Sequence, residues 1–162
     1  MIVADPGSKR LHFAFSGSPQ EVMPRVETIE AFLLQAGCVA AAAQKVAMAA
    51  EEILTNIARH AWAGRERGNC TVDVAAVVKD GAIHVRLRTE DDGVAFDPTR
   101  AKGRDLDAAL EQRSIGGLGI VLIRTLTDTQ EYHRVAARNI FKVTAVCPRQ
   151  PDAPPPALHA PT

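Results

Sequence analysis

The sequence predicts an α/β protein, more narrowly an α+β two-layer sandwich with one mixed, mostly antiparallel sheet and its helices on one face. The expected order of elements is strand, helix, helix, two strands, loop, helix, two strands, which is not the regular strand and helix alternation of a parallel sheet. Short hairpin turns join two of the strand pairs and make those pairs antiparallel. With 162 residues, 46% of them apolar, the chain can form one core.

The first strand is predicted where apolar and other residues alternate, at Leu11, Phe13 and Phe15. A helix should then begin at Ser18, with Pro19 in its first position and Glu21 placed to complete a capping box. Gly37 can end this helix. Its buried face is expected to contain residues at helical spacing, namely Val22, Val26, Ile29 and Leu33.

A second helix is predicted from about Val39 to Ala61. Glu52, Asn56 and His60 follow one another at intervals of four and therefore form a polar line along one side. A stripe for the core runs beside this line, formed by Ala50, Ile53, Ile57 and Ala61. A solvated helix face would also explain the polar line.

Two strands with alternating apolar residues follow, at 70–78 and 83–87, around the turn signal Lys79-Asp80-Gly81. Residues 99–113 are polar and predict a loop with a short helix at most. A glycine-rich entry then leads into a helix over 117–127. The residues of this helix expected to face inward are Leu118, Val121, Leu122 and Leu126.

The last hairpin is expected from strands at 131–136 and 140–146, around Ala137-Arg138-Asn139. Beyond it the chain is rich in proline and alanine, a composition that does not support a packed element. We therefore expect one domain over 1–147 and a disordered tail over 148–162.

Charge and composition exclude several classes of function. The formal net charge is zero, which gives no electrostatic reason to expect direct binding to nucleic acid or to an anionic membrane. No stretch is apolar and long enough to span a bilayer, and the N-terminus does not have the pattern of a secretory signal. The three cysteines, Cys38, Cys70 and Cys147, have no metal-ligand spacing. They predict free thiols in a cytoplasmic protein.

Three segments carry candidate chemistry, and each also has a simpler structural explanation. The first is the polar line that begins at Glu52. The second, 91–98, is a turn by its Asp-Gly and Asp-Pro pairs, yet its aspartate can also accept a hydrogen bond from the exocyclic amine of adenine. The third, 116–120, is either glycine punctuation or a phosphate cradle at a helix N-terminus. The chain has no P-loop, no dinucleotide-binding glycine motif and no nucleophile elbow.

Together the three segments resemble the gyrase/histidine-kinase-like (GHKL) ATPases. Residues 52–62 (EILTNIARHAW) are similar to the N-box, 91–95 (DDGVA) to the first glycine box and 116–120 (GGLGI) to the second. Within that superfamily the sequence most resembles the anti-sigma-factor serine/threonine kinases of bacterial partner switching. That closer similarity includes Phe96-Asp97-Pro98, the lid ending in 111–117, and Arg138-Asn139. The resemblance covers about residues 11–146 and implies the histidine-kinase-like ATPase (Bergerat) fold with ATP/ADP and Mg²⁺.

The resemblance also implies roles for individual residues. Asn56 matches the magnesium ligand, Glu52 the catalytic base that accepts the proton of a serine hydroxyl, and Asp91 the adenine-binding aspartate. The residues implied to lie around the nucleotide are Gly93, Ala95, Gly116, Gly117, Leu118 and Gly119. Arg113, at the end of the lid, is a candidate for positive charge at the γ-phosphate, which is our own inference.

Other positions are less clearly assigned. Ala95 departs from the family pattern, since a second glycine often stands there, and alanine excludes backbone conformations that only glycine adopts. His60 matches the N-box, but packing or hydrogen bonding at the helix end explains it better than catalysis. Arg25 resembles an arginine that the family uses for partner binding, and plain solvation explains it equally well.

These observations favour an ATP- and Mg-dependent protein serine/threonine kinase. The resemblance implies that it phosphorylates a STAS-domain anti-anti-sigma partner and forms a homodimer. It also makes a sigma factor a second candidate partner, whose sequestration the sequence leaves open. The alternative is a nucleotide-gated binding module that captures its partner without significant transfer. The ATP-binding part of a histidine kinase is disfavoured, because no dimerisation helix pair with a phosphoacceptor histidine is evident in the sequence.

Overall fold

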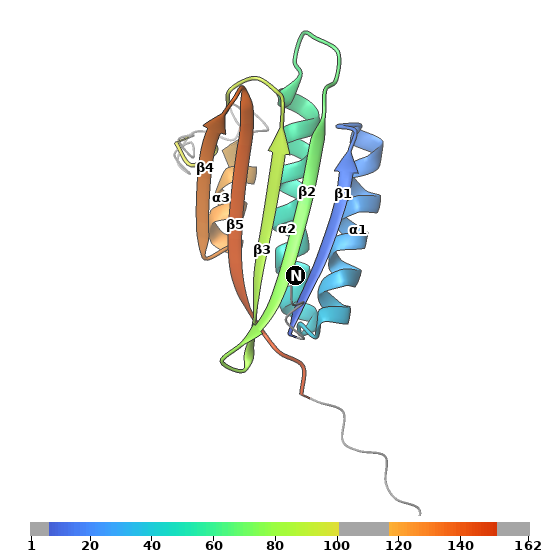
Figure 1. Cartoon of the computed structure of the whole chain (residues 1–162), viewed down its shortest axis with the longest axis vertical. Helices are drawn as coiled ribbons and strands as arrows, with labels where there is room; N and C mark the ends of the chain where they lie inside the picture. The colour runs from blue at the N-terminus through green and yellow to red at the C-terminus, as the bar shows by residue number, and fades with distance from the viewer. Residues whose placement is uncertain (1–6, 101–116, 152–162) are drawn as a thin grey trace, which may run out of the picture.

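The computed structural model describes residues 7–100 and 117–151 of the chain, and Figure 1 shows their arrangement. The predicted lid and the short helix within it lie outside these residues. The described elements, in chain order, are β1 (Ser8–Phe15), α1 (Pro19–Ala36), α2 (Ala40–Asn56), the π-helical turn η1 (Ile57–Ala61), β2 (Cys70–Lys79), β3 (Ala82–Asp91), α3 (Gly117–Leu126), β4 (Thr129–Val135) and β5 (Arg138–Pro148).

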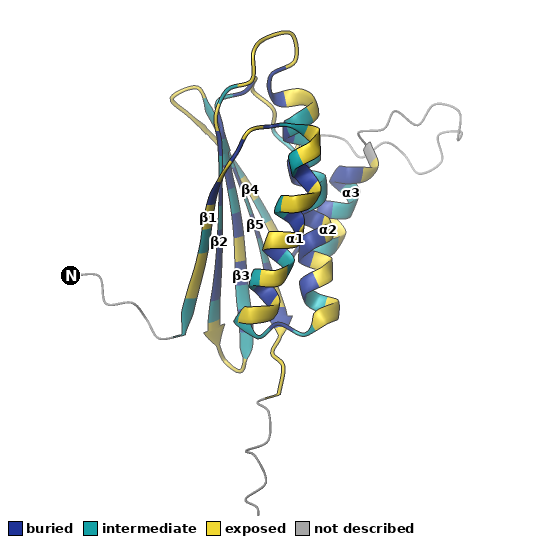
Figure 2. Cartoon of the chain, turned by 90° about the vertical axis from the view of Figure 1, so that its right-hand side faces the viewer, coloured by how far each residue is buried: buried dark blue, intermediate teal, exposed yellow. Residues whose placement is uncertain are grey.

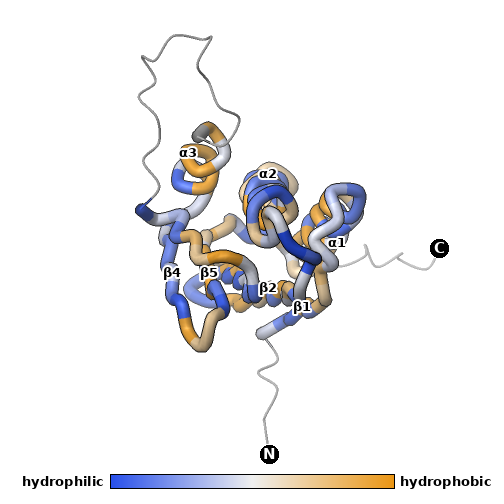
Figure 3. Tube along the Cα trace, turned by 90° about the horizontal axis from the view of Figure 1, so that it is seen from above, coloured by the Kyte–Doolittle hydropathy of each residue, from blue (hydrophilic) through white to orange (hydrophobic). Residues whose placement is uncertain are grey.

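The described strands form one five-stranded sheet in the order β1-β2-β3-β5-β4, with every neighbouring pair antiparallel. The sequence predicted a mixed, mostly antiparallel sheet, whereas all neighbouring strands of the described sheet are antiparallel. All three α-helices cover the same face of the sheet, as Figures 2 and 3 show. The α+β two-layer sandwich predicted from the order of elements is confirmed.

The first helix has the predicted buried face, since Val22, Val26, Ile29 and Leu33 are all buried. Gly37 ends it with φ 101°, a left-handed conformation that glycine adopts without a steric penalty. The prediction that Glu21 completes a capping box with Ser18 is wrong. The Glu21 carboxylate accepts hydrogen bonds from the backbone N–H and the hydroxyl of Ser16, and Ser18 makes no side-chain cap.

The second helix continues through Asn56 and then widens into η1, where the sequence predicted an unbroken α-helix. Ala50, Ile53, Ile57 and Ala61 are buried as expected, and the π-helical turn keeps the last two of them on the core side. Short π-helical segments inside helices are often found at functional sites. Among the described residues, no helix has the combination of length and apolar character needed to cross a membrane.

Both hairpins are present, but the second turns earlier than predicted. Asp80 and Gly81 have positive φ between β2 and β3, as in a type I′ turn. In the second hairpin the residues with positive φ are Ala136 and Ala137. Asn139, expected in the turn, therefore lies within β5 and pairs with Asp91 of β3. The sequence shows no glycine or asparagine at 136–137, which is why the turn was misplaced.

The inward face of α3 differs from the prediction. Ile120 and Ile123 are buried, whereas Leu118, predicted to face inward, is 62% exposed. Because Gly117–Leu126 is apolar almost throughout, its hydrophobic periodicity does not define a face, and packing against α2 does.

The described chain stays hydrogen-bonded past the predicted domain boundary at Cys147. Pro148 still pairs with Ala82, Arg149 bridges to Cys38, and Gln150 donates to the carbonyl of Gly37. These contacts attach the end of β5 to the α1–α2 turn. The three cysteines are free and buried, as predicted for the thiols. The rest of the predicted tail, residues 152–162, lies outside the described part.

Candidate nucleotide site

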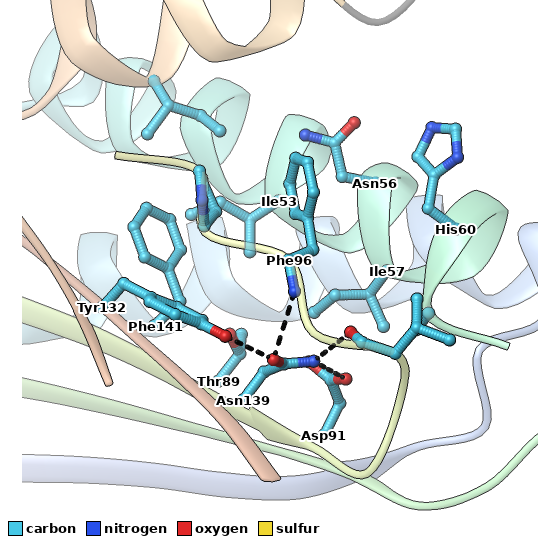
Figure 4. Close-up of a pocket in the computed structure, with 14 residues that line it drawn as sticks. Ile53, Asn56, Ile57, His60, Thr89, Asp91, Phe96, Tyr132, Asn139 and Phe141 are labelled. Carbon is cyan, nitrogen blue, oxygen red and sulfur yellow. Dashed lines mark hydrogen bonds between the residues drawn. The ribbon is translucent and has the colours of Figure 1, made fainter. Parts of the chain in front are cut away.

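A cavity lies between the helix layer and one end of the sheet. Figure 4 shows α2 and η1 on one side of it, the strands β3 and β5 on the other, and Phe96 between them. Cavities with apolar walls and a few polar groups are typical small-molecule sites. The lining residues are Ile53, Asn56, Ile57, His60, Ala61, Thr89, Asp91, Val94, Phe96, Pro98, Ile123, Tyr132, Asn139 and Phe141.

Strand register brings the floor of this cavity together. Asp91 of β3 stands opposite Asn139 of β5. Two residues along, Thr89 stands opposite Phe141, which in turn stands opposite Tyr132 of β4. Side chains two residues apart on a strand point to the same face, and here that is the face toward the helices. The sheet therefore supplies one buried carboxylate within a largely apolar floor.

Asp91 is 5% exposed, and its Oδ1 accepts two hydrogen bonds of 2.9 Å, from the backbone N–H of Gly93 and from Asn139 Nδ2. Burial raises the pKa of the Asp91 carboxyl, while these two donors act in the opposite direction. A buried carboxylate facing an apolar cavity is an acceptor suited to an amine on a planar ligand.

Gly93 allows the loop after β3 to approach the end of η1. A Cβ at this position would lie 2.6 Å from both the carbonyl oxygen and the Cβ of Ala61. The next residue, Val94, donates its N–H to that same carbonyl at 2.8 Å. The sequence predicted that Gly93 lets a nucleotide base approach the backbone closely. In the structure, Gly93 lets the loop after β3 approach the backbone of Ala61.

Asn56, the last residue of α2, lines the cavity from the helix side together with His60. His60 was expected to pack or hydrogen-bond at the helix end, and this expectation is wrong, because its side chain is exposed at the cavity edge. The packing role belongs to Trp62, which is buried and donates Nε1–H to Asp92 Oδ1 at 2.8 Å.

Glu52, one helical turn before Asn56, lies beside the N-terminal end of α3. A Cβ placed on Gly119 would be 2.3 Å from Glu52 Oε2, so any side chain at position 119 would displace this carboxylate. Burial and the neighbouring charge of Glu51 raise the pKa of Glu52, and Arg59 opposes them. A carboxylate with a raised pKa is a better proton acceptor near neutral pH.

The residues present fit a purine nucleotide and a hard cation. The Asp91 carboxylate and apolar walls suit a base, and the glycines at 117 and 119 bring backbone N–H groups to the start of a helix, where anions are favoured. The carboxamide oxygen of Asn56 is a suitable ligand for Mg²⁺, together with phosphate oxygens and water. Of these groups Asn56 and Asp91 line the cavity, and Gly119 lies beside Glu52, one helical turn before Asn56.

The remaining predicted site residues are distributed as follows. Ala95 is exposed in the loop after β3, and Leu118 is exposed on α3; neither lines the cavity. Gly117 is the first residue of α3. Arg113 and Gly116 lie outside the described residues.

Sequence reasoning missed several residues of the floor. Thr89 could have been found, because it continues the inward alternation of Ile83, Val85 and Leu87 as a polar residue before Asp91. Asn139 was missed because the turn was placed on it. Tyr132 was missed because β4 has no clear alternation.

Arg25 is held in place on α1 rather than simply solvated. Its guanidinium contacts the Glu21 carboxylate at 2.6 Å and lies 4.7 Å from the centre of the Phe13 ring. The arginine is thus fixed on the surface, a third of its side chain exposed.

The fold and this arrangement are those of an ATP-binding domain, and the family comparison agrees. The model of the histidine kinase-like ATPase domain matches residues 15–145, and the chain belongs to this family.

Particular relatives point to the kinases named RsbW. The chain is 34% identical to the serine-protein kinase RsbW of Listeria monocytogenes over 91 residues, which cover 54% of this chain and 55% of that protein. The RsbW of Listeria innocua is 33% identical over the same share. The chain thus spans about half the length of the curated relatives it matches.

A solved structure, that of the RsbU and RsbW domains of Rv1364c from Mycobacterium tuberculosis, has a similar fold. Its TM-score is 0.57 at 16% identity, covering 88% of this chain and 33% of that one.

Proposed function

We propose that the protein is an ATP- and Mg²⁺-dependent serine/threonine kinase that phosphorylates a STAS-domain anti-anti-sigma partner. The observation that carries the proposal is the position of the Glu52 carboxylate against Gly119, one helical turn before Asn56, which lines the cavity together with Asp91. The similarity to serine-protein kinases named RsbW supports the same activity. By the same similarity we propose a second role, the sequestration of a sigma factor.

In this proposal each residue has one task. Asp91 accepts the exocyclic amine of adenine, and the start of α3 holds phosphate oxygens by backbone N–H groups. Asn56 would hold Mg²⁺, which when bound neutralises phosphate charge. Glu52 accepts the proton of the incoming serine hydroxyl as its oxygen bonds to the γ-phosphorus. The bond between that phosphorus and the β–γ bridging oxygen breaks, and ADP leaves with the electron pair.

The test is transfer from γ-labelled ATP to a STAS-domain protein of the same organism. Label on a serine of the partner supports the kinase. Glu52→Ala should abolish that label while ATP binding, measured by calorimetry, remains, because the carboxylate acts on the hydroxyl and not on the nucleotide. Unchanged transfer by this variant would refute the role of Glu52. A stable ATP-dependent complex without label would instead indicate the nucleotide-gated binding module.

Two further assignments have their own measurements. Asn56→Ala should weaken ATP binding in the presence of Mg²⁺ and change it little in the presence of EDTA; an unchanged affinity with Mg²⁺ would count against the metal role. The homodimer implied by the resemblance stays a prediction, which light scattering of the purified protein tests.

A further inference from the structure

Asn139 is the most extensively bonded side chain on the floor of the cavity. It is 5% exposed and lies in a row that crosses all five strands, in the order Phe15, Cys70, Asp91, Asn139 and Arg134. A buried carboxamide needs hydrogen-bond partners for both its oxygen and its nitrogen. The partners of Asn139 come from the loop after β3, from Asp91 and Arg134 in the same row, and from Tyr132 on β4.

The neighbours of Asn139 leave its amide one orientation. Its Nδ2 donates to Asp91 Oδ1 at 2.9 Å and to the carbonyl of Val94 at 2.8 Å, and both of these atoms only accept. Its Oδ1 accepts from Arg134 Nη1 at 2.8 Å and from the backbone N–H of Phe96 at 3.4 Å, which only donate. Tyr132 adds its hydroxyl to the same oxygen at 2.7 Å (Figure 4).

These bonds determine which oxygen of Asp91 is available. Oδ1 is occupied by Asn139 and by the N–H of Gly93, whereas Oδ2 has no hydrogen bond from the described part of the chain. Burial favours the protonated acid at Asp91, and a protonated acid is a poorer acceptor for an amine. The Asn139 donor opposes this effect of burial.

We propose that Asn139 is a positioning residue for base selection: its Nδ2 occupies Oδ1 of Asp91 and leaves Oδ2 for the base, so that the site prefers adenine to a 6-oxopurine. Adenine presents an amine at this position, whereas guanine presents a carbonyl oxygen that a carboxylate repels. Asn139 acts through Asp91. The inference rests on the proposed nucleotide site and adds to it the residue that sets its selectivity.

The informative variant is Asn139→Asp, which is isosteric. Its carboxylate still accepts from Tyr132 and Arg134 but presents oxygen, in place of N–H, to Asp91. Two carboxylates so close do not both ionise readily, and they share a proton as the pH falls. That shared proton restores a donor toward Asp91, so the defect should diminish at lower pH.

Other titratable or charged groups face this pair from each packed element. They are Cys70 on β2, Asp92 after β3, Tyr132 and Arg134 on β4, and His60 on η1. Burial raises the pKa of the Cys70 thiol to about 12, so it stays neutral in the range used. All of these groups are present in both the wild-type protein and Asn139→Asp. The difference between the pH profiles of ATP binding by these two proteins therefore reports on position 139.

The experiment measures the Kd of ATP and of GTP, each with Mg²⁺, by calorimetry from about pH 6 to about pH 8.5. For Asn139→Asp we expect ATP binding about 10- to 100-fold weaker at the alkaline end, a smaller loss at the acidic end and a reduced preference for ATP over GTP. Gln35→Glu is the matched control: it makes the same amide-to-carboxylate change at an exposed residue of α1 that does not line the cavity, and it should change both constants less than about threefold.

The outcomes separate the two claims. If the wild-type protein binds no ATP, the proposed function fails. If it binds ATP, and Asn139→Asp weakens ATP and GTP by one common factor at every pH or weakens neither, Asn139 has a structural role at most and the inference is overturned. Should Asn139→Asp not fold, Asn139→Ser replaces it. Its hydroxyl donates only one bond, so it cannot hold both Asp91 and Val94, and an unchanged ATP preference would overturn the inference.

Discussion

A methyl group added at Gly119 should inactivate the proposed kinase without unfolding it. The new Cβ would lie 2.3 Å from Glu52 Oε2, whereas ordinary contacts begin near 3.4 Å, so the carboxylate must move by roughly 1.1 Å. The Cβ of Glu52 would be at 3.8 Å, an ordinary distance, so the movement can be confined to the end of the side chain. Because Gly119 is inside α3, alanine also favours the helix, by about 1 kcal/mol.

The functional cost follows from the displacement. A misplacement of about 1 Å at a reacting group can cost about 100-fold in rate. We therefore expect Gly119→Ala to transfer phosphate about 100-fold more slowly at saturating ATP, with a melting temperature equal to or above that of the wild-type protein. The neighbouring Leu118→Ala is the matched control, because Leu118 is exposed and its truncation should change neither quantity appreciably.

The assay is single-turnover transfer to the STAS-domain partner, with ATP affinity measured separately. A loss confined to ATP affinity would mean that the methyl group obstructs the phosphates and leaves Glu52 in place. In the Glu52→Gln background, Gly119→Ala should cause little further loss, because the two changes act on one carboxylate. Full-rate transfer by Gly119→Ala, or equal losses in both backgrounds, would refute the proposed action through Glu52.

Three further predictions concern packing and pH. Gly93→Ala should destabilise the protein by about 1–3 kcal/mol in urea denaturation, since its Cβ would lie 2.6 Å from backbone, and an unchanged midpoint would contradict the close approach. Ile123→Ala should cost about 2–4 kcal/mol in the same assay and Leu118→Ala less than about 0.5, because only the first is buried; equal effects would contradict the observed face of α3. Glu52 must be ionised to accept a proton, and its pKa is raised, so transfer should fall as the pH drops through that raised value. Glu51→Gln should move this acidic limb to lower pH by removing a repelling charge, and an unmoved limb in the pH–rate profile would count against Glu52 as the base.

Local signals were sufficient for most of the fold. The alternation in β2 and β3, the helical spacing from Val22 to Leu33 and the Asp80-Gly81 turn each have a short-range cause, and each prediction is confirmed. Predictions failed where the cause was not local. The face of α3 is chosen by its neighbour α2, and the partner of Glu21 is a residue of the β1–α1 connection instead of the helix cap.

The candidate site divides in the same way. Glu52, Asn56 and Asp91 could be named because a family motif surrounds each of them in the sequence. Asn139 was not assigned to the site, because its contact with Asp91 comes from pairing across strands far apart in the chain. An asparagine near a hairpin normally indicates a turn, and only the register shows that this one stands opposite Asp91.

The proposed base region and the proposed phosphate region of the site are held together by different interactions. Mutations in the two regions should therefore have different consequences. The proposed base region is attached to a ladder of backbone hydrogen bonds, with Asn139 joining β5 to the loop after β3. The proposed phosphate region depends on α2 and α3 meeting at Glu52 and Gly119, a contact between one side chain and one bare backbone position. Changes in the first region should therefore alter which nucleotide binds, whereas changes in the second should alter what is done with it.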